Sequence, residues 1–417
     1  RGSDMRALLA ATCTAAALLA AGTAAHAQQE KLVIAGRDGG YANALELAVE
    51  SFKQANPDIK VERLALPYGG LYEKTAIAMR EQSGAYDVVM LDDTWAVEFM
   101  SNGWLANLDK LGGGISDDFV EPAVDVSRYP VGSGPLYALP FVGNVELFAY
   151  NSEILDAHDL SAPESWDEVV KIAQTVDANA KNTAGVVFRG QKANPIVTGF
   201  LPILWAHGGR VVTGNGKAGL TSDGALAALE TFLVLKQYAP EGVINYNSSE
   251  VRDALMTGRT AMTIELWPSW APDLDNPDKS QVVGDIEIMA APGQIEGPAP
   301  MLGSWLVAVP RDSDNKQLAR AFIDHLTSAK MQKKLALEVG TPPTRASVYQ
   351  DDEVVNKYRW YPAQLEALRN AQPRPRITDW SRVETIVGDY LQLAMIGEMT
   401  PKAALEEANA RIARALN

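Results

Sequence analysis

The sequence predicts an α/β fold divided between two lobes, and three observations support this prediction. First, short β-branched runs alternate with amphipathic helical segments in the N-terminal part of the chain, which is typical of parallel strands covered by helices. Second, a chain of 417 residues is long enough for two domains. Third, near Tyr137 two β-rich runs follow each other without a helix between them, which indicates a crossover into a second lobe.

The N-terminal residues 1–27 are not expected to belong to the fold. Residues 1–4 (RGSD) are interpreted as a vector-derived remnant, and they precede a basic start and an apolar run of about 15 residues. This run is too short for a membrane span and ends in a small-x-small pattern at 25–27, so it predicts a cleaved secretory signal. The single cysteine, Cys13, lies inside it, so we expect a disulfide-free periplasmic protein.

Strands and helices alternate from residue 31 onward in the first predicted lobe. The expected strands cover 31–36, 59–65 and 86–91, and the expected helices cover 42–54, 70–81 and the stretch that ends at 100. In parallel sheets, ligands bind outside the carboxyl ends of the strands, where loops lead into helices. Asp38–Tyr41 and Asp92–Trp95 occupy that position.

The crossover segment Leu136–Asn151 leads into a second set of helices and strands. Helical patterns are followed by β-rich runs and then by a mainly helical C-terminal region. The expected elements are a helix in 163–176, a strand in 183–190, a helix in 221–239, a helix and a strand in 252–270, strands in 284–293 and 304–310, and helices from 315 to 417.

Charge and motifs exclude several classes of function. The net charge of −15 argues against nucleic acid or an anionic membrane as a partner, because both require a basic surface. The three histidines beyond the leader lie far apart, without the spacing of a zinc or copper site, and no nucleotide-binding glycine motif occurs. Gly303-Ser304-Trp305 lacks the second glycine of a hydrolase nucleophile motif. We therefore expect no metal and no cofactor.

Asp92 and Asp93 end the third predicted strand and are the first candidates for a functional site. They could cap the helix that follows or accept hydrogen bonds from a ligand. They could also act with Glu265 as the paired acids of a glycoside hydrolase. The residues alone leave these alternatives open.

Aromatic side chains gather at expected strand ends and loops. The set consists of Tyr41, Trp95, Trp205, Trp267, Trp270 and Trp305. Aromatic rings stack on the C–H faces of sugars, while sugar hydroxyls bond to carboxylates and amides. Each ring taken singly is explained equally well by core packing, which is also the role expected for Trp104, Trp166 and Trp360. The group of rings near acids favours a carbohydrate or polyol ligand.

Three arginines in C-terminal loops allow two interpretations. Arg345 follows GTPPT, and Arg374 and Arg376 lie in QPRPRI. We expect each to anchor its loop through backbone carbonyls. The alternative is that Arg345 binds an anionic group of a ligand through both guanidinium nitrogens.

Several segments occur in the order known from one family of proteins. They are the leader, KLVIAG, YDVVMLDDTWAVEFMSNGWLANLD, LPFVGNVELFAYN, WAHGGRVV, TGRTAMTIELWPSW, GTPPTRASVY and GEMTPKAALEEANARI. Together they resemble the family 1 extracellular solute-binding proteins of ABC importers, the maltose-binding-protein-like group. The resemblance implies the type II periplasmic-binding-protein fold, with two doubly wound lobes joined by a hinge of crossing segments that close on a ligand. It also implies transport without catalysis and docking on a membrane permease.

The residues and the resemblance together nominate a ligand-binding set and lobe boundaries. The nominated side chains are Tyr41, Asn43, Asp92, Asp93, Trp95, Asn144, Trp205, Glu265, Trp267, Trp270, Gly303, Trp305 and Arg345. The first lobe is expected to comprise 28–142 and about 286–337, and the second 143–285 and about 338–417. The leading hypothesis is a monomeric periplasmic binding component of an ABC importer for a carbohydrate or polyol. The alternatives are a binder of an anionic sugar derivative that uses Arg345, and a secreted glycosidase.

Overall fold

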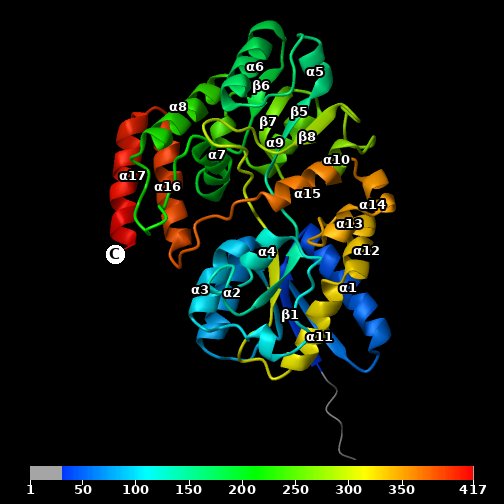
Figure 1. Ribbon diagram of the computed structural model, residues 1–417. Helices are drawn as coiled ribbons and strands as arrows, with labels where there is room; N and C mark the ends of the chain where they lie inside the picture. The colour runs from blue at the N-terminus through cyan, green and yellow to red at the C-terminus, as the bar shows by residue number, and fades with distance from the viewer. Residues whose placement is uncertain (1–30, 417) are drawn as a thin grey trace, which may run out of the picture.

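The computed structural model describes residues 31–416 as two α/β lobes, which lie one above the other in Figure 1. The predicted leader, residues 1–27, lies outside the described residues. Within the described part of the chain, no helix has the length and apolar character needed to cross a membrane. The α/β class expected from the sequence is confirmed.

The first lobe is built on a five-stranded sheet with the order β2-β1-β3-β9-β4. Its strands are β1 (Lys31–Arg37), β2 (Lys60–Leu66), β3 (Val88–Asp92), β4 (Ala138–Val142) and β9 (Trp305–Ala308). β1 is parallel to β2 and β3, whereas β9 is antiparallel to β3 and β4. Every residue of β3 is buried, which explains its continuous apolar run. The run ends at Asp92, the last residue of the strand, at its carboxyl end.

Helices cover both faces of this sheet. α1 (Gly40–Ala55) buries a stripe that includes Leu45, Val49 and Phe52, at the spacing of an amphipathic helix, and packs against α11 and α12. The other helices of this lobe and of its border with the second are α2 (Tyr68–Arg80), α3 (Asp93–Ser101), η1 (Leu108–Lys110), α4 (Glu121–Asp125), α11 (Lys316–Leu326), α12 (Ala329–Val339), α13 (Ala346–Tyr349), α14 (Asp352–Lys357) and α15 (Tyr361–Arg369).

The second lobe has a four-stranded sheet with the order β6-β7-β5-β8. Its strands are β5 (Leu147–Asn151), β6 (Ala184–Val187), β7 (Thr260–Leu266) and β8 (Ile286–Met289). The helices around it are α5 (Ser152–Asp156), α6 (Trp166–Asn179), α7 (Asn194–Ala206), α8 (Asp223–Gln237), η2 (Val243–Asn245), α9 (Ser248–Met256), α10 (Ala271–Leu274), α16 (Trp380–Met395) and α17 (Pro401–Ala415). The C-terminal pair α16 and α17 lies on one side of this lobe, against α7 and α8.

Three linkers connect the lobes and run side by side. They are residues 143–146 between β4 and β5, residues 290–304 between β8 and β9, and residues 370–379 between α15 and α16. Gly303 donates its backbone N–H to Asn144 at 3.0 Å, and Leu302 donates to Gln372 at 2.8 Å. The linkers therefore form a hydrogen-bonded bundle between the lobes, where small backbone rotations can change the angle between them.

Two of the expected lobe boundaries are wrong. β8 pairs with β5, so residues 286–289 belong to the second sheet, and the chain returns to the first lobe only through the linker before β9. Helices α13 and α14 pack against α12, so the chain directly after 338 stays with the first lobe, whereas α15 contacts both α4 of the first lobe and β8 of the second. Strand pairing and helix packing connect distant residues, and no local pattern specifies them.

Candidate ligand-binding site

A cavity of about 250 Å³ lies between the lobes and is lined by residues from both lobes and from all three linkers. The first lobe contributes Arg37, Tyr41, Tyr68, Asp92 and Trp305. Loops after β6 and β7 contribute Arg189, Trp267, Ser269 and Trp270, and the N-terminal parts of α7 and α9 contribute Asn194, Thr198 and Ser248. The linkers contribute Asn144, Gly303 and Arg374.

A second, larger cavity of about 540 Å³ lies on the second lobe alone, beside β6 and α9. Its lining residues, among them Asp177, Tyr246 and Arg259, come from that lobe only. A ligand there would make the same contacts whether the lobes were open or closed, so it could not favour either state. The interlobe cavity is therefore the better candidate site.

Seven of the nominated residues meet in the interlobe cavity. They are Tyr41, Asp92, Asn144, Trp267, Trp270, Gly303 and Trp305. Tyr41 and Asn144 are joined by a 3.0 Å hydrogen bond from the Asn144 amide to the tyrosine hydroxyl. The cavity thus lies at the carboxyl ends of the first-lobe strands, where ligands bind in parallel sheets.

Trp95 lies behind the cavity wall and does not line it. Its ring centroid is 4.7 Å from that of Tyr68, 5.3 Å from that of Tyr72 and 5.7 Å from that of Trp305. Trp305 meets it edge-on, at an interplanar angle of 83°. Trp95 is therefore positioned to support Tyr68 and Trp305, which do line the cavity.

Asp92 both caps a helix and faces the cavity, so the predicted capping role is confirmed and the ligand-binding role stays a prediction. Its Oδ1 accepts from the backbone N–H of Thr94 at 3.1 Å, which satisfies the first turn of α3. The same oxygen accepts from Arg374 Nη2 at 2.8 Å, and Oδ2 accepts from the Tyr68 hydroxyl at 3.0 Å. These donors hold the carboxylate in one orientation at the cavity wall.

Asp93 points away from the cavity and into an arginine cluster. Its Oδ1 accepts from Arg374 Nη2 at 2.5 Å, and its Oδ2 lies 3.5 Å from Arg376 Nη1. Arg376 also donates to the backbone carbonyls of Asp93 and Val126, as expected for a loop anchor. Arg374 was expected to anchor its loop through backbone carbonyls. Its guanidinium instead pairs with the carboxylates of Asp92 and Asp93, and the residue lines the cavity.

The two adjacent aspartates have opposite pKa shifts. Burial opposes ionisation of both, and it raises the pKa of Asp93 to about 7 despite the nearby Arg374. For Asp92, Arg374 together with hydrogen bonds from Asp93 and Thr94 outweighs burial and lowers the pKa. Asp92 thus remains ionised at the cavity wall, while Asp93 titrates near neutral pH.

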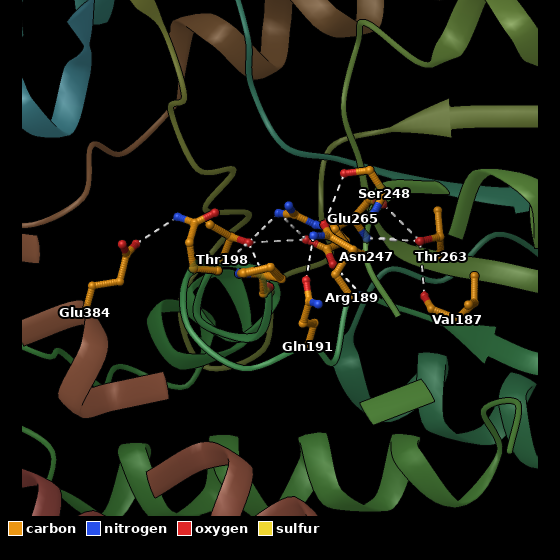
Figure 2. A network of polar contacts seen from close by, with 11 residues as sticks. Val187, Arg189, Gln191, Thr198, Asn247, Ser248, Thr263, Glu265 and Glu384 are labelled. Atoms are coloured by element: carbon orange, nitrogen blue, oxygen red, sulfur yellow. Dashed lines mark hydrogen bonds and ion pairs between the residues drawn. The ribbon is translucent and has the colours of Figure 1, made fainter. Parts of the chain in front are cut away.

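On the opposite wall, Glu265 holds Arg189 from behind (Figure 2). Glu265 is fully buried at the end of β7; it accepts from the Arg189 backbone N–H at 2.6 Å and lies 3.0 Å from Arg189 Nη2. Arg189 Nη2 also donates to Thr198 Oγ1 at 2.5 Å, and its guanidinium carbon is 5.5 Å from the ring centroid of Trp267. Burial raises the pKa of Glu265, and the attraction of Arg189 opposes that rise.

Four further nominated residues lie away from the cavity or behind its wall. Glu265 lies behind Arg189, Asn43 is exposed on α1, and Trp205 is buried in the core of the second lobe. Arg345 donates from Nε to the Thr327 carbonyl at 2.8 Å and lies 3.6 Å over the Phe119 ring, so its predicted role as an anion clamp in this site is wrong. It is the loop anchor that the first interpretation expected.

Eight cavity residues were missed. They are Arg37, Tyr68, Arg189, Asn194, Thr198, Ser248, Ser269 and Arg374. Arg37 ends β1 and Arg189 follows β6, so the strand-end rule applied to every strand would have found both. The position of Arg374 carries no such local signal, because it depends on where the third linker crosses the first lobe.

The arrangement gives little support to paired-acid hydrolysis. Of the three acids proposed for it, only Asp92 lines the cavity. Asp93 and Glu265 each bind an arginine on the far side of the wall. A glycosidase requires two carboxyl groups that flank the scissile bond.

Two sheet-based lobes, three hydrogen-bonded linkers and a polar cavity between them define a two-lobed solute-binding protein. Residues 38–333 match the family model for the bacterial extracellular solute-binding protein, and the chain belongs to this family. The resemblance noted in the sequence is thereby confirmed.

Relatives and solved structures agree with this assignment. The chain is 26% identical over 385 residues to a probable amino-acid ABC transporter periplasmic-binding protein of Sinorhizobium fredii, covering 90% of this chain and 86% of that one. Maltose-bound MalE3 of T. maritima is 26% identical with a TM-score of 0.82, over 92% of this chain and 99% of that one. A ribitol complex of an ABC transporter solute-binding protein from Agrobacterium radiobacter is 26% identical with a TM-score of 0.81, over 93% and 98%. These matches confirm the maltose-binding-protein-like, type II fold.

Proposed function

We propose that this protein is the binding component of an ABC importer for a carbohydrate or polyol. It takes the ligand in the interlobe cavity and delivers it unchanged to a membrane permease. We place it in the periplasm, as a monomer that has lost its leader. The observation that carries the proposal is the cavity itself, which is rich in hydrogen-bonding groups and is lined from both lobes.

The chemistry of the wall supports a hydroxyl-rich ligand. The cavity wall combines donors such as Arg189 and Asn194 with an acceptor, Asp92, and with hydroxyl groups that can both donate and accept hydrogen bonds. A hydroxyl group donates one hydrogen bond and accepts others, so a ligand with several of them can satisfy this mixed wall. The indoles of Trp267 and Trp270 supply apolar surface for the C–H groups between the hydroxyls.

The size of the cavity supports a ligand of one sugar or polyol unit. Ligand cavities in proteins commonly measure about 300–1,000 Å³. At about 250 Å³, the interlobe cavity falls below that range. A monosaccharide or an alditol fits this volume better than a maltooligosaccharide does.

Ligand contacts on both lobes explain how binding produces a transport-competent form. Arg189 and Trp267 belong to the second lobe, whereas Asp92 and Tyr41 belong to the first. A ligand that bridges the two groups binds the closed form more tightly and shifts the population toward it. The permease then distinguishes the closed, loaded protein from the open one.

A thermal-shift screen followed by calorimetric titration tests this function. The panel contains ribitol, mannitol, pentoses and hexoses, maltose and longer maltodextrins, sugar acids and the amino acids. We expect a neutral pentitol, hexitol or monosaccharide to raise the melting temperature, because a ligand that binds only the native state stabilises it by mass action. Recovery of the ligand intact by chromatography is the second expected result. Stabilisation by amino acids alone, or recovery of cleaved sugar, would contradict the proposal.

A further inference from the structure

We propose, building on the function proposed above, that Asp93 and Glu265 make the cavity selective for neutral ligands over anionic ones. Neither side chain lines the cavity. They act from behind its wall, by neutralising the two arginines, Arg374 and Arg189, that present N–H groups to the ligand. They are thus specificity-determining residues that do not touch the ligand.

The cavity needs such compensation because several guanidinium groups surround a small space. Arg37, Arg189 and Arg374 all line the same cavity of about 250 Å³. Guanidinium groups bind carboxylates and phosphates through parallel, charge-assisted hydrogen bonds. Without compensating charge, three of them in one small cavity would favour an anionic ligand.

Each of these arginines has at least one carboxylate partner. Arg189 Nη2 is 3.0 Å from Glu265, and the two side chains are 8% and 0% exposed. Arg374 Nη2 is 2.5 Å from Asp93 and 2.8 Å from Asp92, with side-chain exposures of 4%, 0% and 8%. Arg37 pairs with Asp38, whose side chain is 44% exposed.

Burial gives the first two pairings their effect on ligand choice. Charges that are shielded from water interact more strongly than exposed ones at the same distance, so Asp93 and Glu265 reduce the positive potential at the cavity wall. The guanidinium groups keep their remaining N–H donors for hydroxyl oxygens. An anion that enters loses its hydration and meets paired arginines together with the ionised Asp92, so its desolvation is not compensated.

Other acids near the cavity do not replace this pair. Glu146 is buried in the first linker; its charge interacts with those of Glu265, Arg189 and Arg374. Burial, followed by repulsion from Glu265, raises the pKa of Glu146 well above its usual value, and neither of its carboxyl oxygens accepts a hydrogen bond within the described residues, so it does not pair with an arginine. Glu384 accepts instead from the uncharged amide of Asn194, at 2.9 Å.

Isosteric amide variants test the proposal directly. Asp93→Asn replaces Oδ2, which accepts no hydrogen bond among the described residues, and keeps Oδ1 as the acceptor for Arg374. Glu265→Gln keeps one oxygen as the acceptor for the Arg189 backbone N–H. Asp324→Asn is the control. It also removes a carboxylate from a buried arginine, since Asp324 Oδ2 lies 2.9 Å from Arg320 Nε, but neither residue lines the cavity.

The readout is the ratio of two affinities measured by calorimetry at pH 8, where the Asp93 carboxyl is mainly ionised. The ligand pairs are ribitol with ribonate, mannitol with mannonate, and galactose with galacturonate; each pair exchanges one CH₂OH group for a carboxylate. We expect the wild type to prefer the neutral member of the pair that it binds. Asp93→Asn and Glu265→Gln should each shift the ratio toward the anion by about tenfold or more, and Asp324→Asn should leave it unchanged.

The outcomes separate this proposal from the function on which it rests. A wild type that binds a neutral ligand, with both amide variants retaining its ratio, would overturn the selectivity role alone. A wild type that prefers the anionic member would also overturn that role. Failure of the wild type to bind any neutral sugar or polyol of the panel would overturn the proposed function and this inference together. Circular dichroism checks folding, and if one variant does not fold, the other decides.

Discussion

One nitrogen of Arg374 donates to Asp92 at 2.8 Å and to Asp93 at 2.5 Å, across 282 and 281 residues of chain. This contact fastens the third linker to the carboxyl end of β3, where α3 begins. Both carboxylates raise the pKa of Arg374 further above its usual value, against the effect of burial. The same guanidinium therefore joins a linker to the first lobe and forms part of the cavity wall.

Replacing Arg374 by methionine should destabilise the protein and abolish ligand binding. The change leaves Asp92 without its buried cationic partner and leaves Asp93 with only the longer contact to Arg376. Breaking a buried ion pair by removing one partner commonly costs about 3–5 kcal/mol. Urea unfolding measures the loss of stability, and Arg359→Met, at a partly exposed ion pair, is the control. A change below that of the control would contradict the assigned role.

The stability of the wild type should depend on the ionisation of Asp93. Its pKa is raised from 3.8 to about 7 on folding, so the native state holds a proton that the unfolded state has released between these values. The resulting stabilisation is complete below pH 3.8 and is lost as the pH rises through 7. Asp93→Asn removes this dependence, so its unfolding free energy relative to the wild type should increase from pH 5 to pH 8. Urea titrations at the two pH values measure the difference, and an unchanged difference would disprove the shift.

Gly303→Ala should weaken ligand binding, because there is no space for a methyl group at this position. A Cβ on Gly303 would lie 2.5 Å from Cζ3 and 2.9 Å from Cη2 of Trp267, so the indole would have to move within the cavity wall. We expect a loss of affinity of about tenfold or more, measured by calorimetry. Gly297→Ala in the same linker is the matched control, since nothing lies within 4 Å of its Cβ position. Equal affinities of the two variants would show that the indole position does not matter.

Trp95→Phe should affect stability more than affinity. Trp95 packs among Tyr68, Tyr72 and Trp305 without lining the cavity, so the smaller ring leaves a gap in the support of the wall. We expect a loss of stability of about 1–3 kcal/mol by urea unfolding. Trp267→Phe, at the cavity itself, should reduce ligand affinity more than stability. If Trp95→Phe reduces the affinity more than Trp267→Phe does, Trp95 contacts the ligand and its supporting role is wrong.

Arg345→Ala should lower stability and leave the affinity for every ligand unchanged. Its side chain donates to the Thr327 carbonyl and covers Phe119, and both contacts lie outside the cavity. The loss of this partly buried hydrogen bond and of the stacking should lower the melting temperature by a few degrees. Loss of binding to a sugar acid in this variant would restore the anion-clamp hypothesis.

The sequence predicted the elements of the fold better than their assignment to lobes. The strand predicted at 86–91 is β3 over Val88–Asp92, and the helix predicted at 221–239 is α8 over Asp223–Gln237. Apolar periodicity and caps are local properties, so they can be recognised within a single stretch of chain. The placement of β8 beside β5 depends instead on pairing between residues more than a hundred positions apart, such as Phe148 and Met289.

The candidate site shows the same division. Asp92 and Trp267 were nominated because they follow β-rich runs, and loops after strands are where ligands bind in α/β sheets; both line the interlobe cavity. Glu265 was nominated by the same reasoning, yet it points behind the wall to Arg189. Consecutive side chains along a strand point to opposite faces, so the position of a residue at the end of a strand does not fix which way it faces.

By itself, the sequence determined that this is a two-lobed α/β protein and indicated several of the loops that line the interlobe cavity, because strand and helix periods, caps and turns are encoded by neighbouring residues. Only the tertiary structure decided which loops share a cavity, which arginine meets which carboxylate, and which aromatic rings face the ligand space. Those relationships join Arg374 to Asp92 across 282 residues, and their energies come from burial and charge pairing that exist only when the lobes and linkers are assembled.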